Sequence, residues 1–396
     1  MTLPGAAIAE PRPASLRPNP TSVEAGLWDL SDKAEQHVRR SAELNADPAL
    51  NAYVRSVACK VAADYCADLR IYVLNRPFFN ATMAPNGYTE VWSGLLLRCE
   101  DEAELAFVLG HEASHFAENH TLERHAAMKN SANTALFLSI GIAVAGSAAA
   151  AGSADYQSAQ NIMQATGNLV DAVYLASLAG LFRFSREQES EADLLGVRRA
   201  SEAGYAAAAA SESWRAMMRE TASSDFEKIR KGDARLGIFD SHPLNSQRVA
   251  ALDAELPNLP AGGEVGRERH RAAIRPFLSA WLRDDLRRRD FGETLHIVDR
   301  LARNGEDLGV LNFYRGEAFR LRRGEGDAVR ARDAYAAASE AVDAPIATWR
   351  ELGEAKRRTG DPAGARLALE TYLARAPQAA DAWMVRETLD SLAKVQ

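Results

Sequence analysis

The stretch that most constrains this chain is 108–125, VLGHEASHFAENHTLERH, and within it the pentapeptide His111-Glu112-Ala113-Ser114-His115. On a helix, this spacing places the two histidines one turn apart on one face, where both imidazoles can bind one metal ion. Glu112 lies about 100° round the helix, close enough to reach a water molecule held by that ion. Because a catalytic zinc needs three protein ligands and an open fourth position, the pentapeptide predicts a third ligand elsewhere in the chain.

The residues before the pentapeptide favour this interpretation over a chance match on a solvated helix. Residues 103–110, AELAFVLG, form helices well and are mostly apolar. They predict that the helix is buried, as a rigid metal site requires. We therefore expect His111 and His115 to bind zinc.

A second, acidic motif can supply the third ligand. Residues 185–193 read SREQESEAD, and on a helix Glu189 and Asp193 share a face by the same four-residue spacing. Glu189 can be the third zinc ligand, and Asp193 can accept a hydrogen bond from a ligating imidazole and fix its orientation. Taken alone, each of these acids could equally lie on a solvated helix face.

The other histidines near the pentapeptide do not supply a ligand. The extended pattern HExxHxxGxxH would place a histidine at position 121, where this chain has Thr121, and Glu118 stands where the glycine should be. His120 and His125 fail this spacing, and we interpret both as surface residues.

Taken together, these motifs resemble the M48 family of zinc endopeptidases, and the resemblance covers residues 50–255. One departure is Asn86-Gly87, where the family often has two glycines; the change is mild because asparagine tolerates the left-handed conformation. Besides the two motifs in order, the resemblance rests on Ser185-Arg186, Ala203-Gly204-Tyr205, Phe79-Asn80-Ala81, residues 84–87, Gly94-Leu95-Leu96, and Ser241-His242-Pro243 with Arg248 downstream.

The resemblance implies a gluzincin-type metalloprotease domain at 23–256 that binds one Zn²⁺ per chain. It implies His111, His115 and Glu189 as the ligands and Glu112 as the catalytic residue.

The resemblance also places His242 at the mouth of the active site. There its imidazole could stabilise the tetrahedral intermediate, or it could occupy the open zinc position as a removable ligand. These roles predict opposite effects of His242→Ala, and a third interpretation is that Ser241 and Pro243 merely start a helix. Asn80 is a candidate for binding substrate backbone, and Arg248 is a candidate for supporting the site.

In the segment before the pentapeptide, the spacing of apolar residues changes from that of helices to that of strands. Residues 24–66 have the apolar spacing of helices. Residues 69–74, LRIYVL, and 88–92, YTEVW, alternate like strands and are separated by the turn-rich segments 75–77 and 85–87. The edge of such a sheet could bind an extended peptide by strand addition, or the sheet could merely cover the metal-binding helix.

The composition describes an ordinary soluble globular protein of two or three domains, with 396 residues, 47% hydrophobic and 26% charged. The net charge of -7 gives no reason to expect nucleic acid as a partner. Residues 1–22 are rich in Pro, Ala and Ser without periodicity, which predicts a disordered segment. Within it, Ala7-Ile8-Ala9 resembles a signal-peptidase site, but neither a basic region nor a full apolar region precedes it. Either the real start of the protein lies upstream, or the resemblance has no meaning; the two alternatives have equal weight.

Three cysteines, Cys59, Cys66 and Cys99, allow at most one internal disulfide. If residues 51–66 form one helix, Cys59 and Cys66 lie about 10 Å apart and cannot be bridged. A bond from Cys99 to either one is an alternative, and we favour buried free thiols.

The uncharged segment 130–154 is nearly long enough to cross a bilayer. Glycine and serine interrupt its apolar run and alanine dominates its later part, so its insertion would be weakly driven. We predict a buried or surface-lying helical hairpin with its return limb at 162–181, and peripheral membrane contact through 130–181 stays open. A membrane-integrated protease anchored by 130–154 is the alternative.

The last third of the chain predicts helical repeats. Residues 257–268, which begin PNLPAGGEVG, have the composition of a linker. The residues beyond this linker match the spacing of a tetratricopeptide repeat (TPR) in two successive units. The later unit has Trp349, Leu352, Gly353, Ala365 and Pro377, and the unit before it has Gly316, Ala331, Tyr335 and Ala338. A degenerate unit is expected within 271–304 and a capping helix at 381–393. We expect an all-α, TPR-like domain at 269–396 whose curved surface binds peptides or partner proteins; a lid that only stabilises the protease is the alternative.

The chain is therefore predicted to be α+β and mostly α, with a small sheet in the protease domain. We predict a zinc metalloendopeptidase that hydrolyses peptide bonds of unfolded proteins. Similarity to envelope proteins of the family implies misfolded or unassembled substrates and a location in the cell envelope or periplasm. The rival is a chaperone or scaffold that acts through its repeats and keeps a latent or structural metal site. Glu112 argues against it, because a structural site has no use for a base beside its first ligand.

Overall fold

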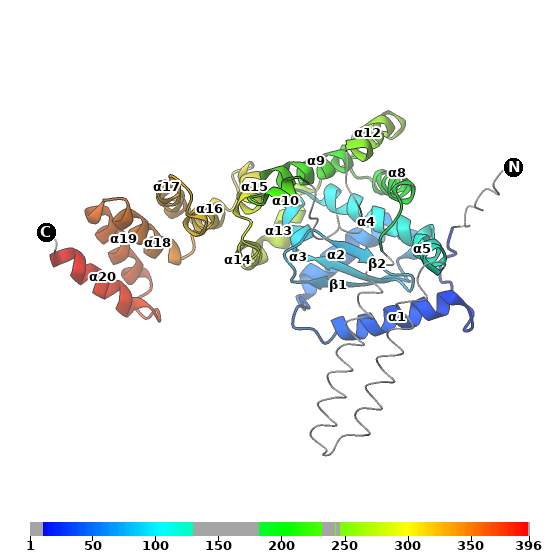
Figure 1. Ribbon diagram of the computed structural model, residues 1–396, viewed down its shortest axis with the longest axis horizontal. Helices are drawn as coiled ribbons and strands as arrows, with labels where there is room; N and C mark the ends of the chain where they lie inside the picture. Colours follow the sequence, from blue (N-terminus) through cyan, green and yellow to red (C-terminus); the bar gives the residue numbers. More distant parts are fainter. Residues whose placement is uncertain (1–10, 130–181, 232–241, 243–245, 395–396) are drawn as a thin grey trace, which may run out of the picture. The chain divides into compact units, whose positions relative to one another are not determined.

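The computed structural model describes residues 11–129, 182–231, 242 and 246–394 (Figure 1). These residues are mostly helical with one small sheet, which confirms the predicted fold class. The chain forms two compact units. The first holds Met1–Leu96, Asp101–Trp214 and Arg235–Arg267, and the second holds Leu97–Glu100, Arg215–Ala234 and Glu268–Gln396.

Several predictions fall outside the described residues. They concern the signal-peptidase-like site at 7–9, the apolar hairpin at 130–181, and Ser241 and Pro243. In the part of the chain that the structure describes, no helix is both long enough and apolar enough to cross a membrane.

The first unit is built round a three-stranded sheet with the order β1-β3-β2. Strand β1, Arg70–Leu74, runs parallel to β3, Tyr88–Trp92, so both predicted strands are present. The chain turns into β3 at Gly87, whose φ of 82° lies in the left-handed region and whose Cβ would be 2.1 Å from the Asp68 carbonyl oxygen. The short strand β2, Ala81–Met83, pairs antiparallel with β3 and forms an edge of the sheet.

Helices pack against both faces of this sheet (Figure 1). Helix α1, Val23–Val38, lies on one face, while α2, Pro48–Val61, and α4, Glu102–Ala117, lie on the other. Helix α3, Ser93–Arg98, leads into α4, and every residue of α4 is buried, as its apolar sequence predicts. The core between α1 and the sheet consists of Leu27, Ala34, Val38, Leu74, Ala84 and Tyr88.

Three more helices of the first unit carry site residues or their neighbours: α5, His120–Lys129; α8, Arg186–Glu202; and α12, Ser246–Glu255. Helix α8 begins with a capping box. The Ser185 hydroxyl accepts a hydrogen bond from the Gln188 backbone N–H, and the Gln188 side chain accepts one from the Ser185 backbone N–H. The acidic motif therefore lies on a helix with a well-defined start.

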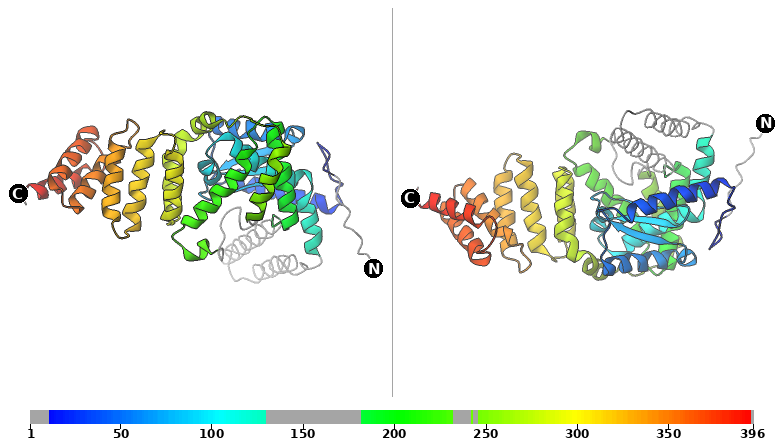
Figure 2. Two further views of the ribbon diagram at one scale, coloured as in Figure 1. Left: turned by 90° about the horizontal axis from the view of Figure 1, so that it is seen from above. Right: turned by 90° about the horizontal axis from the view of Figure 1, so that it is seen from below.

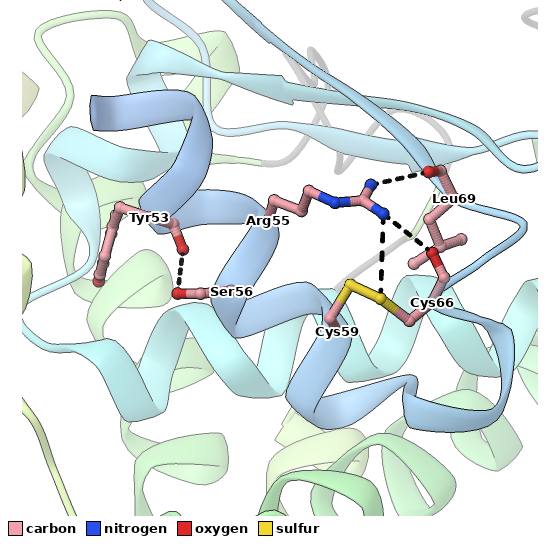
Figure 3. Close-up of a disulfide and its surroundings, with 6 residues drawn as sticks. All are labelled: Tyr53, Arg55, Ser56, Cys59, Cys66 and Leu69. Atoms are coloured by element: carbon pink, nitrogen blue, oxygen red, sulfur yellow. Dashed lines mark hydrogen bonds between the residues drawn. A yellow bond between two sulfur atoms is a disulfide. The ribbon is translucent and has the colours of Figure 1, made fainter. Parts of the chain in front are cut away.

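The structure contradicts the prediction that Cys59 and Cys66 cannot be bridged. Helix α2 ends at Val61 and a 3₁₀ helix follows at Ala63–Tyr65, so 51–66 is not one helix. The turn brings the two Cα atoms to 4.8 Å, and a disulfide joins the cysteines (Figure 3).

Arg55 holds the chain beyond this disulfide in place. Its guanidinium donates hydrogen bonds to the carbonyl oxygens of Leu69 at 2.9 Å and of Cys66 at 3.3 Å (Figure 3). Cys99 is a buried free thiol, as expected.

The disorder predicted for residues 1–22 does not hold from residue 11 onward. Arg12 is only 3% exposed, and its backbone N–H donates to the Ala117 carbonyl at 2.6 Å. Its guanidinium pairs with Glu24 at 2.6 Å and lies 4.8 Å from the centre of the Phe116 ring. Composition could not show this, because a single buried arginine ties the polar segment to the end of α4.

The second unit contains a succession of helices that pack in antiparallel pairs (Figure 2). Helices occur over each part of the predicted repeats and at the predicted capping position. Their bounds are α9, Ala208–Ser223, which starts in the first unit; α10, Glu227–Arg230; α13, Arg267–Ile274; α14, Leu278–Arg287; α15, Phe291–Ala302; α16, Leu308–Arg322; α17, Asp327–Ser339; α18, Ala347–Arg358; α19, Pro362–Arg375; and α20, Ala382–Lys394.

The same contact recurs in two successive helix pairs. A Cβ on Gly316 of α16 would lie 2.4 Å from the Tyr335 ring of α17, and a Cβ on Gly353 of α18 would lie 2.6 Å from the Leu369 side chain of α19. In each pair a glycine lets the second helix approach closely. This recurrence agrees with the repeat spacing in the sequence, while the assignment to the TPR family stays a prediction.

Arg98 explains why 97–100 and 215–234 pack with the carboxyl-terminal helices. It is 3% exposed and donates hydrogen bonds to Glu220 and Asp285, each at 2.7 Å. A buried charge without a partner would be strongly destabilising, so these three side chains hold their segments together.

Candidate metal centre

Helices α4 and α8 bring the three predicted ligands together. His111 and His115 lie one turn apart on α4, and their Nε2 atoms are 3.1 Å from each other. Glu189, in the first turn of α8, places Oε2 at 3.7 Å from His111 Nε2 and Oε1 at 3.7 Å from His115 Nε2. All three side chains are buried, with 1% exposure or less.

This donor set fits a zinc ion. Two ligands about 2 Å from one tetrahedral zinc lie roughly 3.3 Å from each other, which is close to the separations of 3.1 and 3.7 Å found here. Two imidazoles and a carboxylate are also a ligand combination that catalytic zinc sites use. The cluster of His111, His115 and Glu189 could therefore hold one Zn²⁺.

His242 reaches the same cluster from the segment before α12. Its Nδ1 lies 2.7 Å from Glu189 Oε1 and 3.4 Å from His111 Nε2, and its side chain is 1% exposed. The ligand atoms of His242 and the three predicted ligands all lie within 4.8 Å of one another. Its other nitrogen, Nε2, is 3.9 Å from Glu112 Oε1. The imidazole is thus placed where a fourth ligand would be.

Asp193 and Arg248 contact the ligands His111 and Glu189 and hold them in place. Asp193 Oδ1 lies 3.0 Å from His111 Nδ1 and accepts a hydrogen bond from Trp214 Nε1 at 3.1 Å. Arg248 donates to both carboxylate oxygens of Asp193, at 2.6 and 2.8 Å, and its Nη1 is 2.8 Å from Glu189 Oε2. With a carboxylate at Nδ1, His111 carries its proton there and presents the lone pair of Nε2 to the cluster.

The charges around the cluster set the protonation of its two acids. Burial opposes ionisation of Asp193, but the hydrogen bonds from Arg248 and His111 outweigh it and lower the pKa of Asp193 to about 2. Burial likewise opposes ionisation of Glu189, yet the nearby His242, His111 and Arg248 leave the pKa of Glu189 below its usual value. Both carboxyl groups are therefore anionic near neutral pH.

Glu112 lies on α4 beside strand β2. It is 1% exposed, and the backbone N–H of Met83 donates a hydrogen bond to it. Burial raises the pKa of Glu112, and the neighbouring His242 and His111 only partly oppose this. A carboxylate whose pKa is shifted toward neutral pH is well suited to accept a proton and return it.

Asn80 directly precedes β2. Its backbone carbonyl accepts a hydrogen bond from the Trp92 N–H at 3.0 Å, while its side-chain oxygen has no hydrogen-bond partner within the described ranges. The residue is 8% exposed. Because an unsatisfied buried oxygen is unfavourable, this amide can accept a hydrogen bond from a molecule bound alongside β2.

The interpretation of His120 as a surface residue is wrong. Helix α4 ends at Ala117, Asn119 has a left-handed φ of 57°, and α5 starts at His120. The turn points His120 back at the cluster, where it is 2% exposed and its Nδ1 lies 2.8 Å from His115 Nδ1. On an uninterrupted helix it would lie about 140° round from His115, so helical spacing alone missed it. The available signal was the asparagine, which sometimes takes the left-handed position that ends a helix.

An HExxH helix, a glutamate on a second helix and a small sheet beside them define the gluzincin class of metallopeptidases. Comparison with known families makes the assignment specific: the chain belongs to peptidase family M48, whose sequence pattern matches residues 35–256. This confirms the resemblance seen in the motifs, and zinc is the metal of this family.

Several named proteases are similar to part of the chain. The mitochondrial metalloendopeptidase OMA1 of Schizosaccharomyces pombe is 29% identical over 199 residues, which cover 50% of this chain and 50% of the relative. The putative beta-barrel assembly-enhancing protease of Vibrio cholerae is 28% identical over 165 residues, covering 40% and 31%. The mitochondrial metalloendopeptidase OMA1 of Bos taurus is 30% identical over 191 residues, covering 47% and 32%. The chain thus spans half or less of these relatives.

Proposed function

We propose that this protein is a zinc-dependent endopeptidase. The observation that carries the proposal is the buried cluster of His111, His115 and Glu189 with the carboxylate of Glu112 beside it. Family membership agrees with this activity. A chaperone or scaffold with a structural metal site would not require a buried acid in this position, and we do not favour it.

Each residue of the site has a separate role in the proposed hydrolysis. When bound, zinc lowers the pKa of a water molecule and polarises the scissile carbonyl. Glu112 takes a proton from the attacking water and delivers it to the leaving amine. Asp193 keeps the His111 imidazole in the orientation that exposes Nε2, and Arg248 holds Asp193 and Glu189 in place through its planar guanidinium.

The substrate is proposed to bind along β2. This strand lies at an edge of the sheet and next to Glu112, so an extended peptide could add to it as a further strand. The side-chain oxygen of Asn80 would accept a hydrogen bond from a substrate N–H. The alternative is that the sheet only covers α4. It does not explain why the Asn80 side-chain oxygen is buried without a hydrogen-bond partner among the described residues.

Cleavage of an unfolded protein such as casein tests the activity. We expect the zinc-loaded wild type to cut casein and Glu112→Gln to be inactive, while both bind one zinc ion per chain. Equal zinc content is the control, because it separates loss of the base from loss of the metal. Cleavage by Glu112→Gln at the wild-type rate would contradict the role of Glu112. A wild type that binds zinc and does not cut, even as His242→Ala, would favour the chaperone.

We further propose that the substrates are misfolded or unassembled proteins in the cell envelope. The name of the Vibrio cholerae relative refers to β-barrel assembly, which supports a role in protein quality control. The Cys59–Cys66 disulfide supports an oxidising compartment. Thiol labelling of protein taken directly from cells tests this location: only Cys99 should react after unfolding, whereas three reactive thiols would contradict it. Peripheral membrane contact through 130–181 stays a prediction.

The second unit is proposed to bind a protein partner or substrate. A cavity of about 220 Å³ lies between α16, α17 and α18, with Phe319 and Tyr335 among its lining residues. Arg323 and Arg358 also line it and are exposed, and neither forms an ion pair within the described residues. Arg320, Glu351 and Glu354 line the cavity too, but each forms an ion pair: Arg320 with Glu351, and Glu354 with Arg357. The two cations without an ion pair among the described residues lie beside aromatic rings, and this combination suits a peptide carboxylate next to an apolar side chain.

Peptide binding tests this surface. Peptides with a free carboxyl terminus should bind more tightly than their amidated forms, and the double variant Arg323→Ala/Arg358→Ala should remove the difference. Arg332→Ala is the matched control, since Arg332 lies on α17, is paired with Asp333 and does not line the cavity. Equal binding of both peptide forms would contradict the proposal.

A further inference from the structure

The second nitrogens of the two ligand histidines have different partners. His111 Nδ1 lies 3.0 Å from Asp193 Oδ1. His115 Nδ1 instead lies 2.8 Å from His120 Nδ1, and His120 Nε2 lies 3.3 Å from Glu191 Oε2. His115 is therefore connected to a carboxylate on α8 through a second imidazole.

When His115 binds a metal through Nε2, only one arrangement of protons satisfies the hydrogen bonds that link His115, His120 and Glu191. Its Nδ1 then carries the proton and donates it to Nδ1 of His120, which must be an acceptor. His120 consequently carries its own proton on Nε2 and donates to Glu191. Every hydrogen bond in this row then joins one donor to one acceptor.

The fold holds His120 in this orientation. The left-handed turn at Asn119 starts α5, and the Asn119 side-chain oxygen accepts a hydrogen bond from Arg12 at 3.0 Å. Phe184 stacks on the His115 ring with 3.9 Å between centroids, and its centroid is 6.0 Å from that of His120. His115 therefore has an aromatic ring on its face and a hydrogen-bond partner at its edge.

We propose that His120 is a positioning residue for His115, and that Glu191 orients His120. This inference rests on the proposed function, because it assumes that His115 binds zinc. Hydrogen-bond partners of metal-bound histidines fix the tautomer and the ring orientation, and their loss typically weakens metal binding by about 10–100-fold. For His115 a neutral imidazole plays the part that Asp193 plays for His111.

Three variants of α5 test the proposal. His120→Ala removes the acceptor, whereas His120→Asn places an amide oxygen close to the position of the imidazole Nδ1. His125→Ala is the matched control, since His125 lies on the same helix, is half-buried and is outside the cluster. Zinc affinity is measured by competition with a chromogenic chelator, so no readout depends on peptidase activity.

We expect His120→Ala to bind zinc about 10–100-fold more weakly than wild type, and His120→Asn to recover most of this loss. His125→Ala should bind as wild type does. The visible spectrum of the cobalt-substituted protein should change in His120→Ala and return toward wild type in His120→Asn. Because His120→Ala removes a buried imidazole, the metal-free variant should melt at a lower temperature than wild type. A merely structural role of His120 would lower this melting temperature without changing the cobalt spectrum.

A second pair of variants keeps the test decisive if His120→Ala does not fold. The Glu191 side chain is 49% exposed, so Glu191→Ala should fold, and we expect it to weaken zinc binding by about tenfold. Glu187→Ala, at an exposed position of the same helix, should have no effect. Wild-type zinc affinity and an unchanged cobalt spectrum in His120→Ala, or in Glu191→Ala, would overturn the inference. A wild type without zinc affinity would instead overturn the proposed function on which it rests.

Discussion

Gly110 and Gly196 let α4 and α8 touch backbone to backbone beside the metal centre. A Cβ on Gly110 would lie 2.8 Å from the Gly196 carbonyl oxygen, and a Cβ on Gly196 would lie 2.7 Å from the His111 backbone nitrogen. Both distances are too short for a side chain. The distances of 3.7 Å from Glu189 to the two ligand histidines therefore depend on this pair of glycines.

Gly196→Ala is expected to push α8 away from α4. It should weaken zinc binding at least tenfold, because the ligands on the two helices no longer converge, and it should destabilise the fold by about 1–3 kcal/mol through overpacking. Chelator competition and thermal unfolding of the metal-free protein measure the two effects. Gly26→Ala is the matched control: Gly26 lies within α1, a Cβ there meets nothing within 4 Å, and alanine should stabilise the helix by up to about 1 kcal/mol. Wild-type zinc affinity in Gly196→Ala would show that the close contact between α4 and α8 does not set the ligand geometry.

His242→Ala is expected to raise peptidase activity severalfold. The structure brings His242 Nδ1 to 2.7 Å from Glu189 and 3.4 Å from His111, where it would occupy the position that a substrate carbonyl or a water molecule needs. Initial rates of casein cleavage measure the effect, with His125→Ala as control. A collapse of activity with unchanged zinc content would instead assign His242 to stabilisation of the tetrahedral intermediate.

Removal of the disulfide is expected to destabilise the first unit. The bond closes a loop with a sequence separation of 7, for which chain entropy predicts about 2 kcal/mol. Cys59→Ser/Cys66→Ser should therefore unfold at lower urea concentration than wild type, and reductant should shift the wild type by the same amount. Cys99→Ala keeps the pair and should stay sensitive to reductant. If reductant leaves the wild-type transition unchanged, the bond does not form in solution.

The predicted ligands depended on spacing within single helices. His111, His115, Glu189 and Asp193 each lie on an unbroken helix, α4 or α8, where a four-residue interval fixes the shared face. The strands at 70–74 and 88–92 were likewise visible from their alternation. The sequence could not show that the two helices meet at a pair of glycines, because that contact joins residues far apart in the chain.

The wrong predictions concern residues at breaks between elements. Cys59 and Cys66 are bridged because α2 stops at Val61, and His120 is buried because Asn119 reverses the chain. A helical period assigns the wrong direction to every residue beyond such a break. Arg12 was missed for another reason: composition averages over a segment, while one buried side chain is enough to anchor it.

Asp327 is expected to make the stability of the second unit depend on pH. Its carboxylate accepts hydrogen bonds from Arg322 at 2.8 and 2.9 Å, from the Gly324 N–H at 2.8 Å and from Arg330 at 2.9 Å. The hydrogen bonds from Arg322 are the main reason why the pKa of Asp327 is lowered to about 2, with burial opposing them.

Because the pKa of Asp327 is lower in the folded protein than the value of about 3.9 for an unfolded chain, its stabilisation is complete above about pH 4 and is lost as the pH falls toward 2. Asp327→Asn should lower the free energy of unfolding by about 1–2 kcal/mol at pH 7, and its difference from wild type should shrink below about pH 4. Urea unfolding at pH 7, 4 and 3 measures this difference. Asp333→Asn, on the same helix with a side chain 61% exposed, should show a much smaller difference at each pH. A difference for Asp327→Asn that stays constant from pH 7 to 3 would mean that the carboxylate is not stabilised by its arginine partners.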